Sequence, residues 1–309
     1  MSRQYGSKPR IGFIGTGTVG TALAVRLSTK GYPVVAASDK TLSSTQRFAS
    51  MVPECRTYQQ NQDVVDNADI VFITTHDDAI APVAASLRWH SGHSVVHCSG
   101  AASLDILAPA KADGAEIGAM HPLQTFAGVS NAIENIPGST FGIEAEEPLL
   151  STLQEIAGAL ECDWVKLSAG DKVLYHAAAV LVSNYCVTLV KLATDLWESF
   201  GIEPEQATQA LLPLLKGTIS NISNIGIPEC LTGPIARGDT GTINKHISAL
   251  ELSSPDALSA YLEMGLQTIP IALAKGRIDR ETAEALRKLL EEKQHERNAN
   301  RENPSRAGH

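Results

Sequence analysis

The sequence predicts an α/β protein in which a doubly wound parallel sheet is followed by an all-helical C-terminal domain. Two observations lead to this fold class. Short apolar runs alternate with helix-like segments over the first half of the chain, and such runs are typical of parallel strands buried on both faces. From about residue 168 the strand-like runs stop and only helix-like segments follow. We therefore expect domains at 1–167 and 168–292, with a disordered polar tail at 293–309.

Seven short apolar runs predict seven strands, and helix-like segments such as 80–87 separate several of them. The predicted strands are 10–14, 33–37, 68–74, 94–98, 116–120, 140–144 and 163–167. Helical periodicity then covers 171–200, 205–222, 242–250, 255–274 and 279–295.

Composition and charge exclude several classes of partner. Of 309 residues, 43% are apolar, 34 are acidic and 25 are basic, so the net charge is −9. Surfaces that bind nucleic acid are usually basic or aromatic, and only 5% of these residues are aromatic, so nucleic acid is not expected. The five cysteines form no CxxC pair, which predicts reduced thiols and no metal site. With no signal-like segment and no uninterrupted apolar run of about 20 residues, we expect a cytoplasmic protein without membrane contact.

A glycine-rich segment directly follows the first predicted strand and opens an amphipathic helix. In this setting the first glycine permits a tight turn, the second lets a pyrophosphate approach the backbone, and the third allows close helix–strand packing. Exposed N–H groups at the helix start favour the diphosphate. The segment predicts a Rossmann dinucleotide site formed by Gly15, Thr16, Gly17, Thr18, Val19 and Gly20.

The end of the second strand decides the form of the dinucleotide. Asp39 stands where an acid binds the ribose diol of NAD, whereas Lys40, with Ser38 nearby, can hold the 2′-phosphate of NADP. These residues leave the choice open. After the third strand, Thr75 and His76 can contact the ribose on the nicotinamide side, although Asp77 or Asp78 can equally well cap the next helix.

Polar residues also follow the fourth and fifth strands. Ser99, Gly100 and His121 are predicted to line the substrate site, because ligands of open α/β sheets bind at the carboxyl ends of the strands. His97 lies within an apolar run, and we interpret it as a core histidine with satisfied hydrogen bonds.

The helical region offers candidates for catalysis. Lys172 and His176 lie one turn apart on an apolar helix and can donate a proton to a developing alkoxide. The alternative is a solvated Lys172 and a structural, buried His176. Asn184 can reach a substrate oxygen. In the loop that follows, Thr232, Arg237 and Asp239 supply polar groups, and Arg237 can clamp a carboxylate unless it only pairs with Asp239.

Together, several segments resemble the 6-phosphogluconate-dehydrogenase-like superfamily: IGFIGTGTVG, VFITTHDDAI, SVVHCSGA, GAMHPLQTF, YHAAAVLVSNY and LTGPIARGD. The resemblance covers about 10–290 and is strongest to a branch whose C-terminal module has no assigned function. That branch is similar to ketopantoate reductases, pyrroline-carboxylate reductases and hydroxyisobutyrate dehydrogenases. The resemblance implies an NAD(P)-dependent oxidoreductase, a homodimer, and an active site between the two domains. Hydroxy-acid members carry Lys-x-x-x-Asn; here Lys172 fits the lysine, and His176 replaces the asparagine.

The leading hypothesis is therefore reduction of a small 2-oxo acid resembling ketopantoate by NADPH, with NADH as the alternative cofactor. Lys172 or His176 would protonate the product oxygen. The alternatives are an imine reductase of the pyrroline-carboxylate type and a regulatory protein that binds NAD(P) without catalysis.

Overall fold

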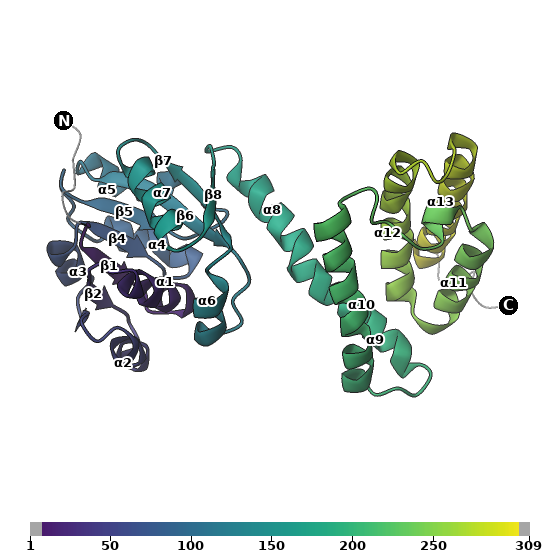
Figure 1. The fold of residues 1–309 in the computed structure, drawn as a ribbon, viewed down its shortest axis with the longest axis horizontal. Helices are drawn as coiled ribbons and strands as arrows, with labels where there is room; N and C mark the ends of the chain where they lie inside the picture. The colour runs from purple at the N-terminus through teal and green to yellow at the C-terminus, as the bar shows by residue number, and fades with distance from the viewer. Residues whose placement is uncertain (1–7, 303–309) are drawn as a thin grey trace. The chain divides into compact units, whose positions relative to one another are not determined.

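The computed structural model describes residues 8–302, and the chain divides into two compact units, Met1–Ser183 and Asn184–His309. The first unit contains the sheet and the second contains only helices (Figure 1). The predicted boundary after residue 167 lies before helix α8 (Lys172–Val182), whereas the units divide after it; the first residue of α8, Lys172, contacts Glu144 of the sheet.

The first unit is built on one eight-stranded sheet in the order β3-β2-β1-β4-β5-β6-β7-β8. All neighbours are parallel except β6 and β7, which pair antiparallel. The sequence analysis missed the short β3 and the antiparallel pair, but it located the other seven strands. Their bounds are β1 Ile11–Ile14, β2 Val34–Ser38, β3 Arg56–Tyr58, β4 Ile70–Ile73, β5 Ser94–His97, β6 Glu116–Leu123, β7 Thr140–Ala145 and β8 Asp163–Lys166.

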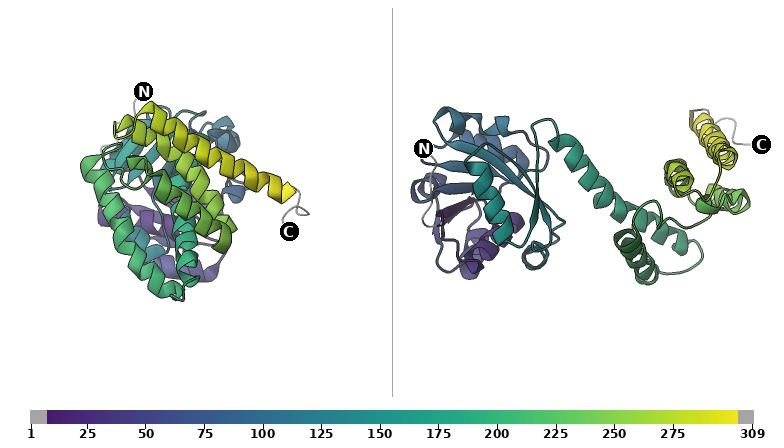
Figure 2. Two further views of the ribbon diagram at one scale, coloured as in Figure 1. Left: turned by 90° about the vertical axis from the view of Figure 1, so that its right-hand side faces the viewer. Right: turned by 45° about the horizontal axis from the view of Figure 1, so that its top comes forward.

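Helices cover both faces of the sheet, as a doubly wound fold requires (Figure 2). One apolar core lies under α1, α2, α6 and α7 and includes the stacked rings of Phe13 and Phe72. The second lies under α3, α4 and α5 and includes Val64, Ile80 and Ala110. The bounds are α1 Thr18–Thr29, α2 Leu42–Met51, α3 Asn61–Asn67, α4 Asp77–Ala85, α5 Ala108–Ala112, α6 Val129–Asn135 and α7 Leu149–Ala159. Because helices bury both faces of the sheet, the strands carry apolar side chains on both faces.

The second unit packs its helices around a separate apolar core that includes Ile243, Leu262 and Leu286. Its helices are α9 Asn184–Glu198, α10 Pro204–Ile225, α11 Thr240–Ser253, α12 Pro255–Ala274 and α13 Arg280–Glu302. The prediction of one continuous helix over 171–200 is corrected, because the helix is interrupted at Ser183 between α8 and α9.

Helix α13 also corrects the predicted tail. The helix continues to Glu302, so 293–302 are helical, and 303–309 lie outside the described residues. Lys293 pairs with Glu251 and Glu296, and Arg297 donates to the Ser259 hydroxyl and the Pro255 carbonyl. Polar composition predicted a frayed end, but these contacts with α11 and α12 hold the helix in place.

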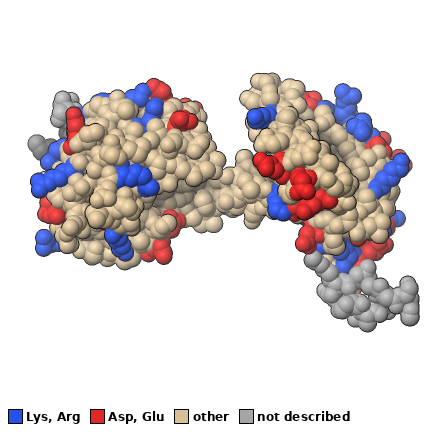
Figure 3. Space-filling view, turned by 90° about the horizontal axis from the view of Figure 1, so that it is seen from below, with Lys and Arg blue, Asp and Glu red and all other residues tan. Residues whose placement is uncertain are grey.

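Helices α8, α9 and α10 expose many large apolar side chains. The stretch Lys172–Glu198 is long and apolar enough to cross a membrane by length and composition, with a mean hydropathy of 1.6, and none of its most apolar window is buried. Helix α8 shows no charged side chain on the face drawn in Figure 3. The exposed residues are Val173, Leu174, Leu181, Val182, Tyr185, Val187, Leu189, Leu214, Ile219, Ile222 and Ile225.

Candidate functional site

A cavity of about 710 Å³ opens at the carboxyl edge of β1, β2 and β4. The residues predicted to bind a dinucleotide gather here. Eight of them line the cavity: Gly15, Gly17, Thr18, Val19, Asp39, Lys40, Thr75 and His76. The other three do not line it: Thr16 and Ser38 are fully buried, and Gly20 is buried where α1 meets the strands.

The three glycines have the spatial roles that the sequence predicted. Gly15 has a φ of +100°, and a Cβ there would lie 2.8 Å from the Thr74 backbone. A Cβ on Gly20 would lie 2.4 Å from the Gly15 carbonyl oxygen. At Gly17 a Cβ would meet nothing within 4 Å, so open space lies beside this backbone. Because α1 also starts without a side-chain cap, its first N–H groups are free to bind a diphosphate, and the residues fit a dinucleotide.

Asp39 ties the glycine loop to the end of β2. Its Oδ2 accepts hydrogen bonds from the Thr16 backbone at 2.7 Å and the Thr16 hydroxyl at 3.1 Å, and its Oδ1 accepts one from the Thr41 backbone at 2.8 Å. Lys40 and Ser44 line the same cavity. A carboxylate suited to a ribose diol and a cation suited to a 2′-phosphate are thus neighbours at this edge.

Helix α8 brings a group of polar side chains onto β5, β6 and β7. Glycines make room for them: a Cβ on Gly100 would lie 2.6 Å from Nδ1 of His176 and 2.9 Å from Nε2 of His121, and a Cβ on Gly142 would lie 2.8 Å from the Tyr175 phenol. The His121 and His176 rings lie edge to face, with 5.8 Å between their centroids. The fold therefore brings His121, Gly100 and His176 together, and their function as a common site stays a prediction.

Lys172 is buried, so the alternative interpretation of a solvated Lys172 is excluded. Its side chain is 2% exposed, and its Nζ lies 3.8 Å from Oε2 of Glu144 on β7. Burial lowers the pKa of Lys172 and raises that of Glu144, while the charge of each partner opposes the shift in the other. Among the described residues, neither atom has a hydrogen-bond partner.

Two histidines of this group, His97 and His121, are held neutral. Burial, with the charges of Lys172 and His121 nearby, lowers the pKa of His97 to about 3. Burial, with His176 and Lys172 nearby, lowers the pKa of His121 to about 4. Burial raises the pKa of Tyr175 to about 12, so its hydroxyl stays protonated and can donate to Nδ1 of His121, which lies 2.9 Å away. The remaining nitrogen of His121, Nε2, then carries the proton.

His97 is only half satisfied, which corrects its interpretation as an ordinary core histidine. It is fully buried, and its Nδ1 accepts a hydrogen bond from the Ser99 backbone at 3.2 Å. Because the neutral ring accepts at Nδ1, its proton lies on Nε2. Within the described part of the chain, that Nε2 finds no hydrogen-bond partner. A buried donor without an acceptor favours a ligand atom at this point.

Ser99 and Asp77 connect this group with the dinucleotide cavity. The Ser99 hydroxyl donates to Oδ2 of Asp77 at 2.6 Å and accepts from the Ala102 backbone at 3.1 Å. Asp77 lines the cavity, and its charge partly opposes the lowering by burial of the pKa of both Lys172 and His121. Asp77 is the first residue of α4 and makes no side-chain cap, so the capping alternative is wrong for it.

Sequence reasoning missed three members of the candidate site: His97, Glu144 and Tyr175. A signal was present for each of them. Tyr175 directly precedes His176, and a glutamate inside an otherwise apolar strand is unusual. For His97 the position at the end of a strand was the available signal.

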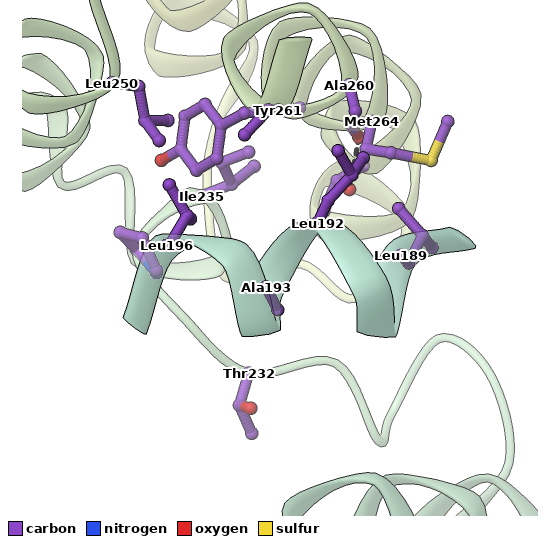
Figure 4. A pocket seen from close by; sticks show the side chains of 14 residues that line it. Leu189, Leu192, Ala193, Leu196, Thr232, Ile235, Leu250, Ala260, Tyr261 and Met264 are labelled. Carbon is purple, nitrogen blue, oxygen red and sulfur yellow. Dashed lines mark hydrogen bonds between the residues drawn. The ribbon is translucent and has the colours of Figure 1, made fainter. Parts of the chain in front are cut away.

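The remaining candidates lie in the helical unit. Asp239 caps α11 by accepting from the backbone and hydroxyl of Thr242, and it lies 3.8 Å from Arg237, so the structural alternative describes this pair. Asn184 is exposed at the start of α9. Thr232 lines a largely apolar cavity of about 390 Å³, in which leucines of α9 face Tyr261 and Met264 of α12 (Figure 4). A substrate role for Asn184, Thr232, Arg237 and Asp239 stays a prediction.

Comparisons with known proteins agree with both units. The family described as "NADP oxidoreductase coenzyme F420-dependent" matches residues 10–100, and a domain of unknown function, DUF2520, matches residues 139–268. The chain is thus similar to an NADP-oxidoreductase domain in its first part and to a DUF2520 domain in its second. This arrangement confirms the superfamily that the sequence resembles, its NADP-dependent oxidoreductase fold, and the prediction of a nicotinamide dinucleotide as cofactor.

Solved structures share the fold over most of the chain. A Bacteroides fragilis protein provisionally described as an NADP oxidoreductase is 22% identical, with a TM-score of 0.67 over 87% of this chain and 98% of its own. A Thermotoga maritima protein is 25% identical, with a TM-score of 0.66 over 90% and 99%. Pyrroline-5-carboxylate reductase from Streptococcus pyogenes is 16% identical, with a TM-score of 0.57 over 91% and 99%. A search of curated proteins finds no match.

Proposed function

We propose that this protein reduces the carbonyl group of a small, ketopantoate-like 2-oxo acid, with NADPH as the cofactor. One observation carries the proposal. Beside the dinucleotide cavity, the polar atoms Lys172 Nζ, His97 Nε2 and His176 Nδ1 are all buried without a hydrogen-bond partner among the described residues. Buried polar groups are rarely left in this state unless a ligand or water completes them. When bound, NADPH supplies a hydride to the carbonyl carbon.

The sign of the charge favours a carbonyl over an imine. Hydride addition to a carbonyl creates a negative alkoxide, which N–H donors stabilise. The neutral imidazoles of His97 and His121 offer N–H donors, and Lys172 offers a proton. The charge of Lys172 already lowers the pKa of both imidazoles, so the same charge would disfavour a cationic iminium. Lys172 therefore acts as the proton donor, with His176 one turn along α8 beside it.

A substrate panel tests this function. Purified protein with NADPH is given small 2-oxo acids, cyclic imines and open-chain imines, and turnover is followed by nicotinamide absorbance. We expect kcat/KM for the best oxo acid to exceed that for the best imine by about tenfold or more, because only the alkoxide uses the donors fully. Turnover of imines alone would overturn the proposal, and saturable NADPH binding without any turnover would support a regulatory protein.

The alternative activity is imine reduction of the pyrroline-carboxylate type. Two carboxylates, Asp77 and Glu144, lie in or beside the donor group and can pair with a protonated imine. The similarity to pyrroline-5-carboxylate reductase agrees with this chemistry at the level of the fold. In that case Lys172 is dispensable, since an amine product needs no proton on an alkoxide.

A second copy of the chain covers the exposed apolar side chains of α8, α9 and α10. Leu181 is 61% exposed and Val182 is 79% exposed, and the exposure of so many large apolar side chains is unfavourable in water. Light scattering should give the mass of two chains, and the double variant Leu181→Glu/Val182→Glu should shift it to one. The matched control, Leu42→Glu, changes an exposed leucine of α2 and should leave the dimer intact. We place this dimer in the cytoplasm, because a reducing compartment suits five free cysteines. A monomeric wild-type protein would contradict the dimer, and flotation of the protein with lipid vesicles would contradict the cytoplasmic location.

A further inference from the structure

Three residues form a row across neighbouring strands of the sheet. His97 on β5 pairs in register with Ala119 on β6, and Ala119 pairs with Glu144 on β7. Residues in register across a sheet point to the same face, so His97 and Glu144 lie on one face with the short side chain of Ala119 between them. All three residues are buried.

Lys172 lies over this row. As the first residue of α8, it places Nζ 3.8 Å from Oε2 of Glu144, and its charge also affects His97. An ammonium group is strongly disfavoured in a buried position unless an opposite charge is near. Of the carboxylates that act on Lys172, Glu144 has the largest effect, ahead of Asp77. Glu144 is thus the main group that can keep this lysine charged.

We infer that Glu144 is a positioning residue that retains the proton on Lys172 Nζ until the substrate oxygen takes it. The inference rests on the proposed function. In the reduction, the N–H bond of Lys172 breaks and the O–H bond of the product forms, and the neutral amine then regains a proton from water. His97 and His121 do not compete for this proton, because both imidazoles are held neutral.

Other titratable groups act on this pair from each element around it. The groups that act on Lys172 or Glu144, or neighbour them in the site, are Asp77 on α4, His97 and Cys98 at the end of β5, Asp105 before α5, His121 on β6, Asp171 before α8, and Tyr175 and His176 on α8. In the described part of the chain, none of these groups forms an ion pair with Lys172; its ion pair is with Glu144.

The pH profile of Glu144→Gln tests the inference. Without the carboxylate, Lys172 loses its proton at lower pH, so the alkaline limb of kcat should move to lower pH by about one unit or more. On the acid side of the profile, where Lys172 remains protonated, kcat should stay within about threefold of wild type. Glu144→Asp keeps the charge and should return the alkaline limb of kcat most of the way to its wild-type pH. The matched control is Glu116→Gln, which removes a partly buried carboxylate at the start of β6.

A second measurement does not depend on turnover. The pKa of Lys172 is read from the NMR titration of its ¹³Cε signal, which is assigned by its absence in Lys172→Met. In Glu144→Gln this titration should move in the same direction and by the same amount as the kinetic limb. An unmoved titration overturns the inference even if oxo acids are reduced. Loss of kcat at every pH, with an unchanged melting temperature, also overturns it, because Glu144 would then be the proton donor itself. If no oxo acid is reduced but the titration of Lys172 is shifted in Glu144→Gln, only the proposed function is rejected.

Discussion

Replacing Lys172 by methionine should lower kcat for the best oxo acid by about 10²- to 10⁴-fold without destabilising the protein. The lysine side chain is 2% exposed, and its Nζ has no hydrogen-bond partner among the described residues, so burying it opposes folding. Methionine fills a similar volume without a charge. Glu144 can take up a proton, since burial already raises its pKa. Activity and stability should therefore change in opposite directions, as is common for catalytic groups.

The pH dependence of this stabilisation has a definite sign. Burial lowers the pKa of Lys172 from 10.5, so the unfolded chain binds more protons than the folded one between the two values. The folded protein therefore gains stability as pH rises through this window. The advantage of Lys172→Met in melting temperature should be largest below the lowered pKa and shrink as pH approaches 10.5.

A matched control is Lys166→Met, which makes the same change at an exposed position of β8 and should leave kcat unaltered. His176→Asn gives the sequence that hydroxy-acid relatives are expected to carry and should reduce kcat less than Lys172→Met. An unchanged kcat in Lys172→Met, with a large loss in His176→Asn, assigns the proton to the histidine instead.

Local sequence predicted those parts of the site that depend on neighbouring residues in the chain. The glycine loop is such a case, because a tight turn between a strand and a helix is specified by the six residues themselves. Lys172 and His176 were found in the same way, since helical spacing alone places them on one face.

The members that were missed depend on contacts distant in sequence. Glu144 faces His97 and Lys172 only because β7 pairs antiparallel with β6 in one particular register. A shift of one residue would turn Glu144 into the opposite apolar core. The strand is buried on both faces, so the alternation of residues along it does not decide how it pairs. Its sequence alone therefore predicts neither the direction nor the register of β7. The orphaned Nε2 of His97 is likewise visible only once its neighbours are placed.

Replacing Gly17 by valine should weaken NADPH binding by about 100-fold or more while the melting temperature stays the same. Gly17 has a φ of −69° and a ψ of −165°, an extended conformation that valine adopts readily. A Cβ there meets nothing within 4 Å, so the folded chain has room for the side chain. The same space is where the pyrophosphate must approach the N–H groups of α1, and the isopropyl group would exclude it.

The binding test has controls of two kinds. Gly158→Ala adds a methyl group at an exposed position of α7 and should leave NADPH affinity unchanged. Gly20→Val should instead lower the melting temperature, because its Cβ would lie 2.4 Å from the Gly15 carbonyl oxygen. Titration with NADPH, followed by protein fluorescence, measures the affinity, and the melting temperature reports the stability separately. If Gly17→Val binds NADPH as tightly as wild type, the diphosphate does not rest on this loop, and the hydride cannot reach the group around Lys172 from the cavity described.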